Sequence, residues 1–84
     1  MPDVTIYTKP YCPYCMRAVQ LLDSKKVQYK EIEAASDLNL RREMIQKSGR
    51  STYPQIFIGD RHIGGCDDIM ALDRSGELDQ LLAA

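Results

Sequence analysis

Hydrophobic residues alternate with polar ones near the start of the chain and recur at helical spacing soon afterwards. Val4 and Ile6 flank Thr5, an alternation that is typical of a strand. Apolar residues between Met16 and Leu22 follow the helical period instead, which predicts a helix. Over the whole chain, these patterns predict four strands, at residues 3–8, 27–33, 55–58 and 61–63. They also predict four helices: from 13 to about 24 or 25, from a cap at 36 or 37 to a stop at 49, from 66 through 72, and a short one after 76.

Turn residues separate these elements and indicate how they connect. Gly49 is a natural residue just past the end of the second helix. Gly59 and Asp60 stand between the last two strands, which predicts a hairpin. The strand–helix–strand order at the start predicts a parallel pair joined by a right-handed crossover. Because no repeat, linker or low-complexity stretch interrupts the pattern, we expect a single domain over residues 1–84.

The composition narrows the class of protein. The 84 residues, 44% of them hydrophobic, suit one small core. The 11 basic and 12 acidic residues give a net charge of -1, so we expect no surface for nucleic acid. We expect no membrane association either, since no apolar run approaches the roughly 20 residues that cross a bilayer and no signal-like leader precedes the first strand. Three cysteines, an odd number, argue against structural disulfides and favour a reducing, cytoplasmic setting.

Two cysteines lie where the first strand gives way to the first helix. Pro13 suits the first helical position, which places Cys12 at the N-terminus among backbone N–H groups that lack an intrahelical acceptor. These groups and the helix dipole favour a thiolate, and Lys9 and Arg17 add positive charge nearby. Cys15 follows one turn later, close enough for a disulfide and less open to solvent. The spacing therefore predicts that Cys12 attacks and Cys15 resolves.

Three motifs in this order resemble those of the bacterial dithiol glutaredoxins, and the resemblance covers nearly the whole chain. They are Cys12-Pro13-Tyr14-Cys15, the run from Thr52 to Ile58, and Gly64-Gly65-Cys66-Asp67-Asp68. The resemblance implies an α/β thioredoxin-like fold, with a central four-stranded mixed sheet flanked by helices on both faces. It also implies a glutathione-dependent disulfide oxidoreductase, an electron carrier in cell redox homeostasis. Such enzymes reduce glutathione mixed disulfides by a monothiol route through the first cysteine and protein disulfides by a dithiol route through both.

The resemblance further implies a groove for glutathione beside the cysteines. Family members place a cis proline there, here Pro54, and use the backbone of the preceding residue, here Tyr53, to pair with glutathione; Thr52 belongs to the same motif. From the residues alone a trans turn is the common alternative, because only about 5–6% of X–Pro bonds in folded proteins are cis. The family usually carries valine in place of Tyr53, so we expect the larger ring to narrow or extend the groove.

The γ-glutamyl end of glutathione needs partners for both a carboxylate and an ammonium group. By resemblance, Gly65, Cys66 and Asp67 supply them with free N–H groups at a helix start and a carboxylate side chain, and Asp68 is a possible helper. The alternative is that Asp67 and Asp68 are ordinary acidic residues at a helix N-terminus. We expect Cys66 to contribute its backbone as a small, half-buried residue and not to act as a third catalytic thiol.

The glycine carboxylate of glutathione needs a cation or hydrogen-bond donors. Similarity to the family indicates Lys9, the Tyr14 hydroxyl and Arg41 on the second helix. The alternative for each is a solvated charge or a surface ring. His62 is the single histidine, and its position on the expected hairpin indicates an exposed strand residue instead of a general base or ligand.

A metal-binding module is the competing class of function. Paired cysteines also occur in copper-binding domains, but those lack the Pro54 turn and the Gly65–Asp67 segment. Pro13 disfavours ligation of an iron–sulfur cluster, and the cysteines with one distant histidine supply structural zinc poorly. We therefore predict no metal and glutathione as the reductant. The expected partners are glutathione and disulfide-containing or glutathionylated proteins, of which ribonucleotide reductase is one example. We expect the protein itself to be a monomer.

Overall fold

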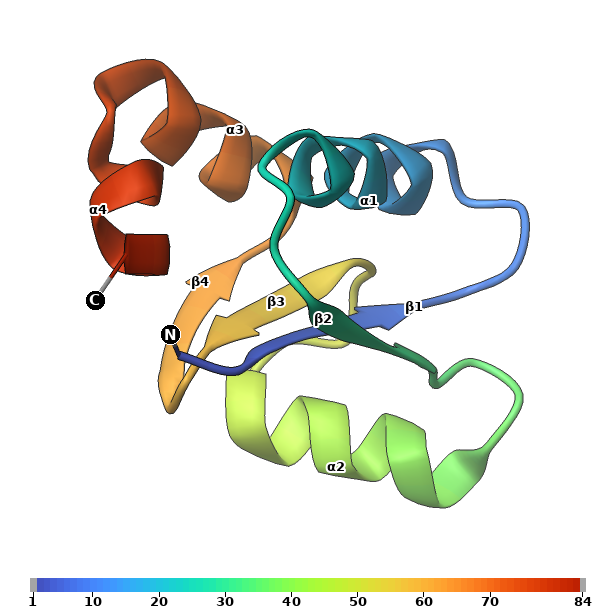
Figure 1. Ribbon diagram of the computed structural model, residues 1–84. Coiled ribbons are helices and arrows are strands. Elements are labelled where there is room, and N and C mark those ends of the chain that lie inside the picture. Colours follow the sequence, from blue (N-terminus) through green and yellow to red (C-terminus); the bar gives the residue numbers. More distant parts are fainter. Residues whose placement is uncertain (1, 84) are drawn as a thin grey trace.

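The protein folds as one four-stranded sheet with helices on both faces (Figure 1). The structure is a computed structural model and describes residues 2–83. Met1 and Ala84, the ends of the expected domain, lie outside the described residues. In chain order the elements are β1 (Val4–Thr8), α1 (Pro13–Ser24), β2 (Tyr29–Glu33), α2 (Leu38–Ser48), β3 (Gln55–Ile58), β4 (Arg61–Gly64), α3 (Cys66–Ser75) and α4 (Glu77–Ala83). This order confirms the expected α/β class and its mixed sheet.

The sheet has the strand order β2-β1-β3-β4. Strand β1 pairs in parallel with β2 and antiparallel with β3, while β3 and β4 form the predicted antiparallel hairpin. Every residue of β3 is buried, because this strand lies inside the sheet between helices on both faces. Because β1 and β3 are antiparallel, the carboxyl end of β1 lies beside the start of β3. The loop that carries the cysteines and the Pro54 turn are attached at this end of the sheet.

Two hydrophobic clusters fill the spaces on either side of the sheet. Residues from α1, α3 and α4 pack over one face, with Leu22, Ile69 and Leu78 completely buried. Met44 of α2 packs with Tyr7 and Phe57 on the other face. Burial of a large apolar side chain stabilises the fold by roughly 1.5–3 kcal/mol, so these clusters hold the helices against the sheet.

Most element boundaries agree with the sequence, and the exceptions have local causes. Asp37 caps α2 by accepting N–H groups of the first turn, and Gly49 ends the helix with φ 72. Strand β2 begins at Tyr29, later than expected. The backbone of Lys26 is left-handed, with φ 57, and the pairing of β2 with β1 starts only at Tyr29. Helix α3 continues past the expected end to Ser75, because the left-handed residue that stops it is Gly76, with φ 84. Within residues 2–83, no helix has the length and apolar character that crossing a membrane requires.

Candidate active site

The sulfur of Cys12 forms part of the cap of α1. Cys12 has an extended backbone at the N-cap position, and Pro13 is the first helical residue, as predicted. The Cys15 N–H donates to Cys12 Sγ at 3.3 Å. A side chain in this position satisfies a backbone donor that would otherwise have no partner in the helix. The fold of the first turn thus directs backbone N–H groups at the predicted nucleophile.

The two thiols of the pair differ strongly in acidity. Burial opposes ionisation of Cys12, but hydrogen bonds from the Cys15 thiol and from the Cys15 and Tyr14 amides, together with the charge of Lys9, hold its pKa below the ordinary value of 9.0. Burial and the hydrogen bond to Cys12 raise the pKa of Cys15 to about 12. Since the thiolate is the attacking species, this difference favours Cys12 as nucleophile and keeps Cys15 protonated.

The two cysteines do not differ in exposure, contrary to the sequence-based expectation. Each has a relative exposure of 4%, and both are free thiols. The prediction that Cys15 is less open to solvent is therefore wrong for the residues as a whole. The N-cap position turns the Cys12 sulfur toward its own first turn, where it accepts the Cys15 N–H. Equal exposure of the two residues does not separate their roles; the hydrogen bonds and charge around Cys12 outweigh its burial, whereas burial dominates at Cys15.

The turn before β3 contains a cis peptide bond between Tyr53 and Pro54. Pro54 is buried, and Thr52 is exposed beside it. A Cβ placed on Gly65 would lie 3.4 Å from the Pro54 carbonyl oxygen, so the Pro54 turn and the start of α3 are in contact. Two segments that the sequence predicted to hold glutathione are thus neighbours in the fold.

The N-terminus of α3 leaves only part of its backbone free. The Gly65 N–H donates to Asp68 Oδ2 at 2.9 Å, which commits this amide within the protein. Asp68 Oδ2 therefore caps the helix; the possible role of Asp68 as a helper for a ligand ammonium group stays a prediction. Cys66 and Asp67 occupy the next two positions, where N–H groups have no intrahelical acceptor. Cys66 is buried, more than the half-burial expected, and that burial raises the pKa of its thiol.

The residues predicted for the glycine carboxylate lie in three places. The Lys9 ammonium nitrogen is 5.9 Å from the centroid of the Tyr53 ring, beside the Pro54 turn, and its charge also lowers the pKa of Cys12. The Tyr14 ring is 55% exposed beside Cys12, with the Arg17 guanidinium 5.9 Å from its centroid. Arg41 lies on α2, on the opposite face of the sheet from α1 (Figure 1), and no contact among residues 2–83 links it to the cysteines.

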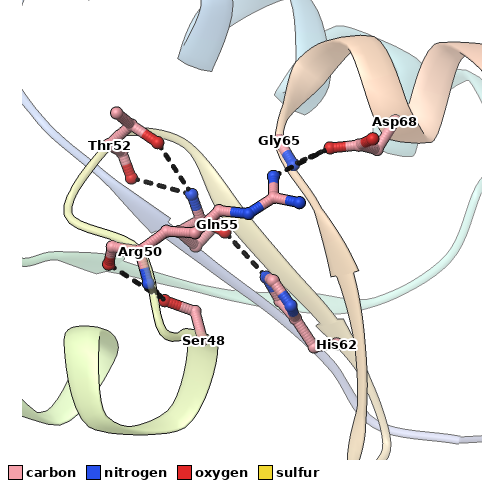
Figure 2. A network of polar contacts seen from close by, with 7 residues as sticks. All are labelled: Ser48, Arg50, Thr52, Gln55, His62, Gly65 and Asp68. Carbon is pink, nitrogen blue, oxygen red and sulfur yellow. Dashed lines mark hydrogen bonds and ion pairs between the residues drawn. The ribbon is translucent and has the colours of Figure 1, made fainter.

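A polar network behind the Pro54 turn was not predicted (Figure 2). Gln55 is completely buried; its amide nitrogen donates to the Thr52 carbonyl and hydroxyl oxygens at 3.0 and 3.1 Å. Its carbonyl oxygen lies 2.7 Å from His62 Nε2. The prediction of an exposed His62 is therefore wrong, because the residue is half-buried. The centroid of its ring lies 5.0 Å from that of Phe57, and its Nε2 is bonded to Gln55. The available signal was Gln55 itself, a polar residue at the head of an apolar strand.

Within residues 2–83, no three histidine, cysteine or acidic side chains gather as a metal site would require.

Comparisons with known proteins agree with this arrangement. The glutaredoxin family model matches residues 4–63. The chain is 54% identical to the glutaredoxin of Pseudomonas aeruginosa over the full length of both proteins. It is also 56% identical to glutaredoxin 3 of Escherichia coli K12, over 98% of this chain and 99% of that one. These matches confirm the resemblance that the three motifs indicated.

Solved structures extend the agreement to three dimensions. The solution structure of a glutaredoxin from Brucella melitensis has a TM-score of 0.86 and 56% identity, covering 98% of this chain and 89% of that chain. A crystal structure of a buckwheat glutaredoxin–glutathione complex also has a TM-score of 0.86, with 35% identity over 95% of this chain and 76% of that one. The helix-capping cysteine pair, the cis-proline turn and these matches show that the chain belongs to the glutaredoxin family, the glutathione-dependent thiol–disulfide oxidoreductases.

Proposed function

We propose that Cys12 is the nucleophile and Cys15 the resolving thiol of this glutaredoxin. The observation that carries the proposal is the position of Cys12 Sγ, which accepts the Cys15 N–H at the N-cap of α1. Hydrogen bonds to a sulfur favour its thiolate, and they stabilise the charge again whenever Cys12 is the leaving group. The same arrangement therefore serves attack on a disulfide and release from one.

In the monothiol route, the Cys12 thiolate attacks the glutathione sulfur of a mixed disulfide. The S–S bond to the substrate breaks, the substrate leaves as a thiolate, and Cys12 becomes glutathionylated. A second glutathione thiolate attacks the bound glutathione sulfur, which forms glutathione disulfide and restores the Cys12 thiolate. Overall one free glutathione thiol is consumed, the substrate thiol is released, and glutathione disulfide forms from that glutathione and the one in the mixed disulfide; Cys15 takes no part.

In the dithiol route, Cys12 attacks a protein disulfide and forms a mixed disulfide with one of its sulfurs. Cys12 then no longer carries charge, so the part of the Cys15 pKa shift due to that charge disappears, although burial still raises it. Cys15 loses its proton, attacks Cys12 and releases the second substrate thiol. Glutathione then reduces the Cys12–Cys15 disulfide in two successive exchanges.

The groove that holds glutathione runs, in this proposal, from Lys9 and Tyr14 past the Pro54 turn to the start of α3. Tyr53 offers its backbone beside the cis bond, and Cys66 and Asp67 offer the N–H groups that remain free. Asp67 is exposed and its carboxylate is free to hold an ammonium group. Gly65 contributes by its shape, since its own N–H is already bound to Asp68.

We assign the remaining expected contacts and partners on the strength of family membership. Thr52, exposed in the turn before Pro54, and Arg41 of α2 are assigned to glutathione by family resemblance alone. The protein acts as a cytoplasmic monomer on glutathionylated and disulfide-containing proteins, with ribonucleotide reductase as a candidate electron acceptor, and it needs no metal. The NADPH that drives the cycle is consumed by a separate glutathione reductase.

The Cys12→Ser and Cys15→Ser proteins test these roles. Reduction of a small glutathione mixed disulfide is followed in an assay coupled to glutathione reductase and NADPH, and reduction of a protein disulfide is followed in parallel. We expect Cys12→Ser to abolish both activities and Cys15→Ser to spare the first and abolish the second. Reduction of the mixed disulfide by Cys12→Ser at the wild-type rate would contradict the assignment.

A further inference from the structure

The two backbone walls of the proposed groove come from separate parts of the chain. One wall is the turn at 52–54 and the other is the start of α3 at 65–67. The hairpin of β3 and β4 joins them, but its pairing is irregular between Ile56 and Phe57, next to the groove. The backbone pair nearest the walls is Ile56 with Gly64, beside the register shift, so side-chain contacts between the walls add to what holds their spacing.

The first wall, the turn at 52–54, is held by hydrogen bonds from the buried side chain of Gln55 to Thr52. Because its amide nitrogen donates to Thr52, its carbonyl oxygen is the acceptor toward His62, and His62 Nε2 carries the hydrogen of that 2.7 Å bond. A fully buried amide whose groups are all bonded costs less free energy than one left unpaired, so this bond pattern locks the turn. These bonds tie the turn to β4 but do not reach α3.

Arg50 supplies the link to the second wall (Figure 2). Its guanidinium nitrogen lies 3.2 Å from Asp68 Oδ2, the same oxygen that accepts the Gly65 N–H at 2.9 Å. Among residues 2–83, this is the single side-chain hydrogen bond between residues 50–54 and α3. The Gly65 N–H does most to hold the pKa of Asp68 below its ordinary value; burial opposes this, and Arg50 lowers the pKa further. The carboxylate is therefore charged at neutral pH.

The backbone of Arg50 is itself anchored to the end of α2. Its N–H donates to Ser48 Oγ at 3.1 Å, and that hydroxyl also lies 2.7 Å from the Met44 carbonyl oxygen. The long side chain therefore starts from a fixed point and ends on a fixed carboxylate. A charged pair with both ends anchored loses less side-chain entropy on forming than an isolated surface pair does.

We propose that Arg50 is a positioning residue for glutathione: through Asp68 it holds the N-terminus of α3 at a fixed distance from the cis-proline turn. The inference rests on the proposed groove. With the Gly65 N–H bound to Asp68, the Cys66 and Asp67 amides face a ligand in one orientation. Without Arg50 the two walls separate more easily, and the protein orders them only when glutathione binds. That ordering lowers affinity for the glutathione moiety and leaves the reaction of Cys12 unchanged.

The experiment compares Arg50→Gln with Lys47→Gln, which also removes one positive charge. Lys47 forms an exposed pair with Glu43 on the same helix and lies outside the groove. We expect Arg50→Gln to raise the KM for a glutathione mixed disulfide about threefold to tenfold, with kcat and the rate of Cys12 alkylation unchanged. Lys47→Gln should leave all three unchanged. An unaltered KM in Arg50→Gln, or an equal rise in both variants, overturns the inference.

A double-mutant cycle with Asp68→Asn separates positioning from direct attraction of the ligand. If Arg50 acts through Asp68, Arg50→Gln has no further effect on KM in the Asp68→Asn protein. A rise of equal size in both backgrounds would mean that Arg50 attracts the ligand itself, which contradicts the proposal. Thermal unfolding of each variant checks that the fold is retained, because a KM change that tracks lost stability also contradicts it.

Asp67→Ala distinguishes failure of the inference from failure of the proposed groove. If the groove is correct, Asp67→Ala raises the KM for the mixed disulfide because it removes the partner of the ligand ammonium group. If Asp67→Ala has no effect, the groove itself is wrong. If Asp67→Ala raises KM and Arg50→Gln does not, the groove stands and the role given to Arg50 is wrong.

Discussion

Two helix N-termini border the proposed site, and they use the same backbone chemistry for different ends. Each presents N–H groups that no helical carbonyl satisfies. At α1 the N-cap residue is Cys12, whose sulfur accepts one of these groups. At α3 the N-cap residue is Gly65, which has no side chain to offer, so the first-turn amides stay open toward the groove. One helix start therefore stabilises an anion of the protein, and in the proposed groove the other is left for an anion of the ligand.

The comparison shows that the N-cap side chain decides what a helix start does. A cap with an acceptor uses the amides internally, and the benefit appears as a lowered pKa at Cys12. A glycine cap leaves them available, but it also leaves the helix end in need of another support. Asp68 provides that support by reaching back to the Gly65 N–H, and Arg50 holds Asp68 in place.

The largest expected effect concerns the two thiols at the α1 end. The pKa of Cys12 lies below its ordinary value of 9.0 and that of Cys15 is raised to about 12, so at pH 7 the thiolate is found on Cys12 far more than on Cys15. We expect iodoacetamide to modify Cys12 first, at a rate that falls as the pH drops through its lowered pKa. Cys15 should stay unmodified until the pH is strongly alkaline.

Mass spectrometry of the modified peptides across pH measures both rates. The Cys12→Ser protein is the control, since it reports Cys15 without the neighbouring sulfur. Comparable rates for the two thiols at pH 7 would contradict the difference in acidity.

A smaller effect is expected when the support of the α3 end is broken. Gly64 has φ 119, and a Cβ there would overlap the Asp68 side chain. We expect Gly64→Ala to lower the free energy of unfolding by about 1–3 kcal/mol, because the strained backbone is combined with displacement of the capping carboxylate. Urea unfolding measures the loss.

Gly59→Ala is the matched control for this variant. Gly59 also has a positive φ, 60, but an added Cβ there would meet nothing. It should show the cost of backbone strain without the clash. A loss in Gly64→Ala no larger than that in Gly59→Ala would show that displacement of Asp68 adds nothing.

The smallest effect is expected from a variant that gives α3 an N-cap side chain, as α1 already has. Gly65 has φ -95, and a Cβ there makes only ordinary contact with the Pro54 carbonyl oxygen, so Gly65→Ser fits. The serine hydroxyl should accept a first-turn amide, as Cys12 does at α1, and compete with the ligand carboxylate. We expect the KM for a glutathione mixed disulfide to rise about threefold to tenfold, which corresponds to about 0.7–1.4 kcal/mol, without loss of stability.

Gly65→Ala adds the same Cβ without an acceptor and is the control. Steady-state kinetics of the two variants in the coupled assay give the comparison. If Gly65→Ala raises KM as much as Gly65→Ser does, crowding and not capping explains the change.

Much of the architecture could be predicted from the sequence, because it depends on local patterns. Alternation and helical periodicity placed all eight elements, and Gly49 marked the end of α2 as predicted. The position of Cys12 at a helix start followed from Pro13 alone. The cis bond before Pro54 is different, since the residues by themselves favoured a trans turn and only the family resemblance predicted it.

The sequence by itself determined the elements and the place of Cys12 at a helix N-terminus, because each depends on neighbours within one helical turn or one strand; the proposed groove segments came from the family resemblance. Only the tertiary structure decided that Cys12 and Cys15 are equally buried, that His62 bonds to Gln55, and that Arg50 reaches Asp68. The two contacts join residues from different elements, 7 positions apart for Gln55 and His62 and 18 for Arg50 and Asp68, and the burial of the cysteines depends on what packs over them. Their partners are fixed by how the helices pack on the sheet, and no local pattern carries that information.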